Sequence, residues 1–93
     1  TQPRVAFGTL IETGAIVPGT ILTDAKRRWK AEVLADGTLA GEGRSGSIHK
    51  LGALLQGAPS CNGWTFWHVE EPAGLVVIDD YRQRHLKATV RPG

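Results

Sequence analysis

Residues 47–57 read Ser-Ile-His-Lys-Leu-Gly-Ala-Leu-Leu-Gln-Gly, and this stretch predicts a helix with two defined ends. Ser47 is a typical N-cap residue, and Gly57 stands where a helix C-terminus is commonly closed. The apolar residues between them recur at helical spacing, which gives the helix one face for a core. These residues are Ile48, Leu51, Leu54 and Leu55.

The segments on either side of this helix read as short elements separated by turns. Alternation of charged and apolar residues predicts two-faced strands, and Asp36-Gly37 predicts a hairpin turn. The hairpin leads into the glycine-rich residues 41–46. In chain order we expect a helix over 5–13, strands over 20–22, 28–33 and 38–40, the helix after Ser47, strands over 65–69 and 75–78, and a last helix capped by Asp79 or Asp80.

These elements add up to an α+β fold, in which an antiparallel sheet of hairpins is flanked by about three short helices. A chain of 93 residues buries roughly 60 to 65% of its unfolded surface, which is enough for a single modest core. We therefore expect residues 1–93 to form one domain. Because the sequence contains no methionine, we also expect it to be a fragment of a longer protein.

The formal net charge of +2 is small, but the charged residues are clustered. Basic residues gather at 26–30 and 82–87, and acidic residues lie between them at 70–80. The single cysteine, Cys61, excludes an intrachain disulfide and fits a reducing compartment, so we expect a cytoplasmic protein. No run approaches the roughly 20 apolar residues that span a bilayer, so we expect no membrane partner.

The stretch after the central helix, residues 57–70, reads Gly-Ala-Pro-Ser-Cys-Asn-Gly-Trp-Thr-Phe-Trp-His-Val-Glu. An exposed indole at Trp64 would offer a flat surface for base stacking, and the Asn62 carboxamide could pair with base edges. The alternative is an Asn-Gly turn with Trp64 folded into the core, which is the commoner arrangement in an arbitrary sequence. We assign Trp67 to the core, inside a strand.

Three segments carry a family resemblance: residues 57–70, Gly-Ser-Ile-His at 46–49, and Asp-Asp-Tyr-Arg-Gln-Arg at 79–84. From about Arg4 to Leu86, the chain resembles the C-terminal domain of bacterial cell-cycle-regulated adenine-N6 DNA methyltransferases, also called the restriction enzyme adenine methylase associated domain. The resemblance implies DNA binding and, for the parent enzyme, a GANTC-type target. The residues that it implicates in DNA contacts are Ser47, Asn62, Trp64 and Arg82.

The sequence has neither the Asp-Pro-Pro-Tyr type catalytic motif nor the Phe-x-Gly cofactor motif of adenine methyltransferases. We therefore expect that the chain is not an enzyme and holds no cofactor. The resemblance implies that S-adenosylmethionine binds an N-terminal methyltransferase domain of the same protein, which would be a partner of this domain. Because an adenine must leave the stack before it is methylated, the DNA partner could have locally opened strands.

Further basic residues are candidates for contacts with the DNA backbone. Period-two alternation would place Lys26, Arg28 and Lys30 on one strand face, a spacing that suits either a sugar-phosphate chain or a solvated surface. Arg44, in the glycine-rich stretch, belongs to the same set. Arg84, on the last helix, is either a phosphate contact or solvated.

Other kinds of site receive less support from the sequence. Cys61 and the three histidines lack paired zinc-ligand spacings, so no metal site is expected, and nothing holds a base beside a Cys61 nucleophile. Gly-x-Gly-x-x-Gly at 41–46 lacks the βαβ unit of a dinucleotide site. Ser47 either only caps its helix or also holds a DNA phosphate. A protein-interaction or dimerisation module, with a homodimeric parent, stays open because tryptophan and arginine are enriched at interface centres.

Overall fold

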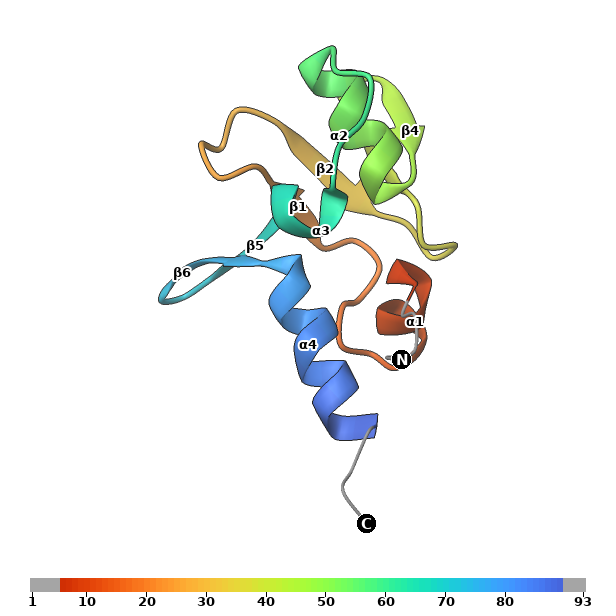
Figure 1. Ribbon diagram of the computed structural model, residues 1–93, viewed down its shortest axis with the longest axis vertical. Helices are drawn as coiled ribbons and strands as arrows, with labels where there is room; N and C mark the ends of the chain where they lie inside the picture. The colour runs from red at the N-terminus through yellow and green to blue at the C-terminus, as the bar shows by residue number, and fades with distance from the viewer. Residues whose placement is uncertain (1–5, 90–93) are drawn as a thin grey trace.

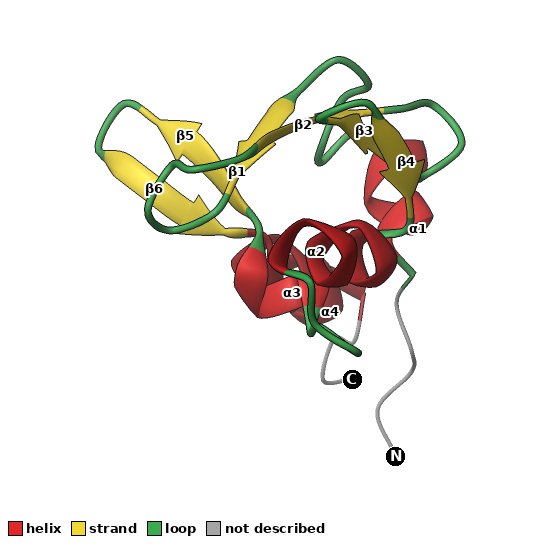
Figure 2. Ribbon diagram, turned by 90° about the horizontal axis from the view of Figure 1, so that it is seen from above, coloured by secondary structure: helices red, strands yellow, loops and turns green. Residues whose placement is uncertain are grey.

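A six-stranded antiparallel sheet and four helices make up residues 6–89, the part of the chain that the computed structural model describes. In chain order the elements are α1 (Phe7–Glu12), β1 (Ile21–Thr23), β2 (Lys30–Val33), β3 (Leu39–Gly41), β4 (Arg44–Gly46), α2 (Ile48–Gln56), α3 (Gly63–Phe66), β5 (His68–Glu71), β6 (Gly74–Val77) and α4 (Ile78–Thr89). The sheet arches over the helices, which gather beneath one of its faces (Figure 2). The predicted α+β class is confirmed.

The sheet joins the two halves of the chain. Its strand order is β4-β3-β2-β1-β5-β6, so the pairing of β1 with β5 connects the N-terminal strands to the C-terminal hairpin. Leu22 lies opposite Ala31 on one side and Val69 on the other, and this row packs into the core. Lys30, one position before Ala31, is exposed, as the alternation of a strand requires.

Trp67 ties the central elements together. Its side chain is fully buried, and its indole N–H donates a hydrogen bond of 2.9 Å to the carbonyl oxygen of Ile48 at the start of α2. Its carbonyl oxygen accepts a hydrogen bond of 2.9 Å from the backbone N–H of Ile78, the first residue of α4. The predicted core position of Trp67 is confirmed, although the residue caps α3 and does not lie inside a strand.

The connection between β1 and β2 is organised by one buried carboxylate. Asp24 accepts hydrogen bonds from the backbone N–H groups of Arg28 and Trp29, at 2.6 and 3.0 Å, and from Nε of Arg28 at 3.1 Å. Burial acts to raise the pKa of Asp24, but these hydrogen bonds outweigh it and hold the pKa below the usual value. The prediction that Lys26, Arg28 and Lys30 share one strand face is therefore wrong. Lys26 and Arg28 lie in this connection, and only Lys30 lies in β2.

The strand expected over residues 65–69 begins later than predicted. Residues 63–66 form α3, and β5 starts at His68. Asn62 explains the difference, because its side chain accepts a hydrogen bond of 3.1 Å from the backbone N–H of Trp64 and caps a helical turn.

Two further boundaries were misjudged from the sequence. The glycine-rich stretch contains β4, because Glu42 and Gly43 adopt φ angles of 53° and 75° and return the chain alongside β3. The last helix begins directly at Ile78, so Asp79 and Asp80 lie in its first turn and do not cap it. The helix after Ser47 is confirmed at both ends, with Gly57 in the left-handed conformation.

Candidate nucleic-acid interface

The beginnings of α2 and α3 are in direct contact. The backbone N–H of Gly63 donates a hydrogen bond of 2.9 Å to Nδ1 of His49. A Cβ at position 63 would lie 2.6 Å from the carbonyl oxygen of Ile48, so only glycine allows this approach. We call this contact, between residues 47–49 and 62–64, the α2–α3 junction.

Both helices at the junction are capped by residues that the sequence had singled out. Oγ of Ser47 accepts a hydrogen bond of 3.0 Å from the backbone N–H of Lys50, which confirms the cap, and Asn62 caps α3 as described above. Each cap directly precedes a residue of the Ile48–Gly63 contact, so the two side chains are brought to neighbouring positions. Both residues are exposed, and the amide –NH₂ of Asn62 makes no hydrogen bond with residues 6–89.

The expectation that the Trp64 indole is exposed is wrong. Trp64 is only 7% exposed, and its ring packs edge-on against Phe7 of α1 at a centroid distance of 6.1 Å. The physical reason is the turn of α3: because Gly63 rests on α2, Trp64 is carried inward and its ring contacts α1 and α4. The alternative, with Trp64 folded into the core, is the arrangement observed.

Arg82 of α4 is linked to the α2–α3 junction through Trp64. Its guanidinium carbon lies 4.5 Å from the centroid of the Trp64 ring, a cation–π contact between α4 and α3. Nη2 of Arg82 also lies 2.5 Å from Oδ1 of Asp79, an ion pair within one turn of α4. The contact is electrostatic and not a well-directed hydrogen bond, because within residues 6–89 neither Oδ1 of Asp79 nor the buried Nε of Arg82 has a hydrogen-bond partner.

The structure thus brings together four predicted residues from three separate stretches of sequence. Figure 1 shows α3 lying between α2 and α4, and α3 contacts both helices. Contacts with α3 therefore link the α2 start to Arg82. The four residues are Ser47, Asn62, Trp64 and Arg82.

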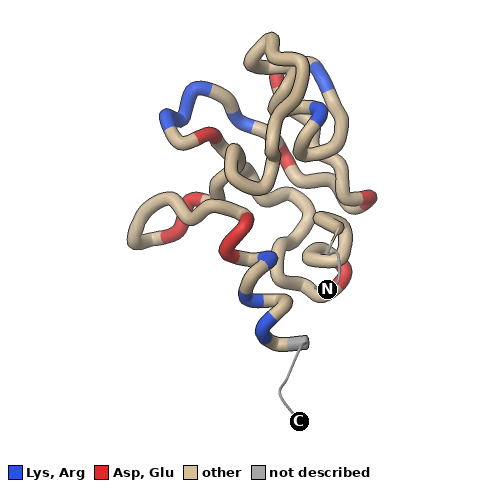
Figure 3. The backbone as a smooth tube through the Cα atoms, viewed as in Figure 1, with Lys and Arg blue, Asp and Glu red and all other residues tan. Residues whose placement is uncertain are grey.

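The remaining basic candidates lie elsewhere. Figure 3 shows lysine and arginine in three separate groups, on the β1–β2 connection, on β4 with α2, and along α4. Arg28 is bound to Asp24 and lies over Trp29 at 4.5 Å, whereas Arg84 lies over Tyr81 at 5.3 Å. The exposed residues Lys30 and Arg44 lie on β2 and β4. The predicted DNA-binding residues therefore comprise one connected group of four and separate basic residues that lie outside it.

Two residues of the group escaped the sequence reasoning. His49 was given no role, yet it accepts the hydrogen bond from Gly63, 14 positions away. Asp79 was considered as a helix cap and as part of the resembling segment 79–84, but not as the partner of Arg82 that it is. The spacing of Asp79 and Arg82, three positions apart on a helix, is a signal that could have revealed the ion pair.

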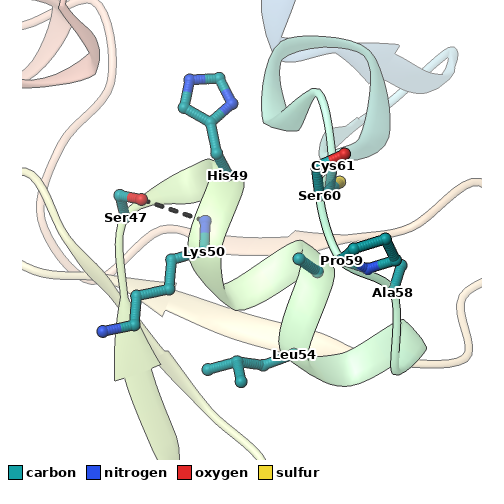
Figure 4. A pocket seen from close by; sticks show the side chains of 9 residues that line it. Ser47, His49, Lys50, Leu54, Ala58, Pro59, Ser60 and Cys61 are labelled. Carbon is teal, nitrogen blue, oxygen red and sulfur yellow. Dashed lines mark hydrogen bonds between the residues drawn. The ribbon is translucent and has the colours of Figure 1, made fainter.

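A pocket of ≈ 450 Å³ lies beside the junction, between α2 and the segment at 58–61. Figure 4 shows Ser47 just before α2, His49 and Lys50 on α2, and Pro59, Ser60 and Cys61 on the facing segment. Burial raises the pKa of the Cys61 thiol, which disfavours the thiolate that a nucleophile needs.

Among residues 6–89, no cluster of three or more His, Cys, Asp and Glu side chains is arranged to hold a metal. None of the helices in this part of the chain is both long and apolar enough to cross a membrane.

A family model covers almost the whole chain. The model described as RAMA, Restriction Enzyme Adenine Methylase Associated, matches residues 1–91. The matched range includes every residue of the connected group.

Proposed function

The chain belongs to the Restriction Enzyme Adenine Methylase Associated family, and from this membership we propose that it is the DNA-binding module of a site-specific adenine-N6 DNA methyltransferase. The family is an associated domain and not the catalytic methyltransferase domain. In this proposal, methyl transfer and S-adenosylmethionine binding belong to an N-terminal domain of the same protein. The module engages target DNA of the GANTC type for that domain, in a cytoplasmic bacterial enzyme.

One observation carries the proposal: the α2–α3 junction presents two exposed capping side chains, and Trp64 of the same junction holds the Arg82 guanidinium at 4.5 Å. A helix start such as that of α2 offers free backbone N–H groups and a positive dipole end, which suit a DNA phosphate. The free –NH₂ of Asn62 can donate to a base edge or a phosphate. Arg82 supplies the positive charge that phosphate contacts require.

The burial of Trp64 changes the role that we propose for it. A ring that is 7% exposed cannot stack on a base, so we propose that Trp64 acts on DNA through Arg82, by holding its guanidinium. Ser47 then serves both as a cap and as a phosphate contact. Lys30, Arg44, Arg84 and Arg28 would add outlying phosphate contacts, of which Arg28 is the most restricted because Asp24 already binds it.

A fluorescence anisotropy titration tests the proposal. The 93-residue chain is titrated into labelled matched duplex, centrally mismatched duplex and single strand, each with and without GANTC, over a range of salt. For each phosphate contact, we expect the logarithm of the binding constant to fall by about 0.9 per log unit of salt. Tighter binding to the mismatched duplex or the single strand would identify locally opened DNA as the preferred partner.

One variant tests whether the α2–α3 junction itself contacts the DNA. Asn62→Ser keeps an oxygen that can cap α3 but removes the –NH₂ donors, so we expect DNA affinity to fall about tenfold at unchanged stability. The matched control is Gln56→Ser, which removes a carboxamide from the other end of α2. An affinity that Asn62→Ser leaves unchanged would contradict the proposed interface.

The second candidate function is a protein-interaction or dimerisation module of the same parent. It requires self-association or partner binding that depends on protein concentration without DNA. Sedimentation of the chain alone distinguishes the two functions, because the DNA-binding proposal does not require a dimer.

A further inference from the structure

Arg82 is held between two groups of different character. The Trp64 ring comes from α3, whereas the Asp79 carboxylate comes from α4, one turn before Arg82. The ring fixes where the guanidinium lies, because its flat face contacts the side chain at 4.5 Å. The carboxylate occupies Nη2, one of the nitrogens with which an arginine binds a phosphate.

The Asp79–Arg82 pair is poorly satisfied. A carboxylate and a guanidinium form their strongest contact through two parallel hydrogen bonds, but here one close approach carries the pair. Oδ1 of Asp79 and Nε of Arg82 are buried and lack hydrogen-bond partners among the described residues. A tetrahedral phosphate can accept from Nε and Nη2 of an arginine together, which would satisfy the nitrogen that Asp79 leaves unpaired.

We propose that Asp79 stands in for a DNA phosphate at Arg82, and that DNA binding replaces the carboxylate with a phosphate oxygen. The inference rests on the proposed DNA-binding function and adds a residue that restrains it. Asp79 keeps Arg82 in place on Trp64 when DNA is absent, and it must be displaced when DNA binds. The side chains of both residues are about one quarter to one third exposed, although Oδ1 of Asp79 and Nε of Arg82 are themselves buried. A phosphate therefore reaches Nε only when the carboxylate moves aside.

A plain charge effect has to be separated from this exchange. Any acidic residue near the interface repels DNA, and both Asp79 and Asp80 lie in the first turn of α4. Asp80 is exposed and makes no ion pair with the described residues. Asp80→Asn therefore measures the general loss of one negative charge, and Asp79→Asn measures that loss plus the release of Arg82.

The test is a double-mutant cycle on the 93-residue chain, read as affinity for a GANTC duplex by anisotropy. The variants are Asp79→Asn, Asp80→Asn, Arg82→Gln and the double variant Asp79→Asn/Arg82→Gln. We expect Asp79→Asn to bind about two- to fivefold more tightly than Asp80→Asn, which is the range for a partly exposed ion pair. In the Arg82→Gln background, the extra gain from Asp79→Asn should disappear.

Two results would overturn the inference. The first is an Asp79→Asn variant that binds no more tightly than Asp80→Asn. The second is an equal gain from Asp79→Asn with and without Arg82, which would make the effect independent of the pair. Urea unfolding of all five proteins verifies that each is folded before the affinities are compared.

A second measurement keeps this inference apart from the proposed function. The side-chain Nε–H signal of Arg82 in a ¹⁵N correlation spectrum, assigned with Arg82→Gln, should move when the duplex is added. If the duplex binds and this signal stays in place, the exchange at Arg82 is refuted and DNA binding stands. If neither duplex nor single strand binds, the proposed function fails and the inference fails with it.

Discussion

Residues 6–89 contain two arginine–tryptophan–aspartate clusters with nearly the same contacts. In the local cluster, Arg28 lies over Trp29 at 4.5 Å and binds Asp24. In the assembled cluster, Arg82 lies over Trp64, also at 4.5 Å, and pairs with Asp79.

The two clusters differ in their carboxylates. The carboxylate of Asp24 accepts three hydrogen bonds and closes a turn, whereas Oδ1 of Asp79 accepts none from the described residues. A carboxylate with all its acceptor positions used stabilises the fold, whereas a buried acceptor without a donor is costly. In our proposal, this difference is what allows a phosphate to replace the Asp79 carboxylate at Arg82. The same three residue types therefore serve structure in the local cluster and, in our proposal, binding in the assembled one.

The largest expected contrast is between the two tryptophans. Trp64→Ala should lower the free energy of unfolding by about 3 to 5 kcal/mol, because it leaves a cavity between α1 and α4. Trp29→Ala should lower it by less than about 2 kcal/mol, since Trp29 is only partly buried. Urea unfolding followed by far-UV circular dichroism measures both. Equal losses would remove the distinction between the clusters.

A smaller effect is expected from breaking the α2–α3 junction while every side chain of the two clusters is retained. Gly63→Ala places a Cβ 2.5 Å from the backbone of Ile48, so the two helices must separate, at a cost of about 2 to 3 kcal/mol. Gly8→Ala is the matched control. A Cβ at Gly8 of α1 meets nothing within 4 Å, so this variant should be neutral or more stable by up to about 1 kcal/mol. Two variants of equal stability would show that the junction tolerates a side chain.

The smallest expected effect is a change in the free energy of unfolding at low pH. The folded-state pKa of Asp24 lies below its ordinary value of 3.8, so the charged carboxylate stabilises the fold above that pH. This contribution is lost as the pH falls through the folded-state pKa. The difference in unfolding free energy between the wild type and Asp24→Asn, about 1 kcal/mol near neutral pH, should therefore shrink in acid. A difference for Asp24→Asn that stays constant down to pH 2 would contradict the role assigned to this carboxylate.

The sequence was sufficient where the determining contacts are local. The Ser47 cap acts on Lys50, three positions away, and Asp36-Gly37 turns the chain within one hairpin, so these elements were predicted correctly. The local cluster could also have been found, because Asp24 and Arg28 are four positions apart. The periodic pattern assigned Lys26 and Arg28 to a strand because it carries no information about a buried carboxylate nearby.

The sequence was insufficient where contacts join distant segments. Trp64 and Trp67 are both tryptophans in the same short stretch, so the residue type alone does not tell whether each of them is buried. The helical turn that buries Trp64 depends on the contact of Gly63 with Ile48. The family resemblance named four residues that the fold links through α3, but it left their geometry open. Whether the Trp64 ring faced a base or an arginine was decided by packing against α1 and α4.

The β1–β5 pairing has a consequence for the order of folding. Four of the five strand pairings join consecutive strands, whereas β1 and β5 are separated by β2, β3, β4 and two helices. Closing that long loop carries the greatest entropy cost of the five pairings. We therefore expect the β1–β5 pairing, which we call the seam, to form last and to open first. Hydrogen exchange should then report two cooperative units on either side of the seam, with β5, β6 and α4 detaching together.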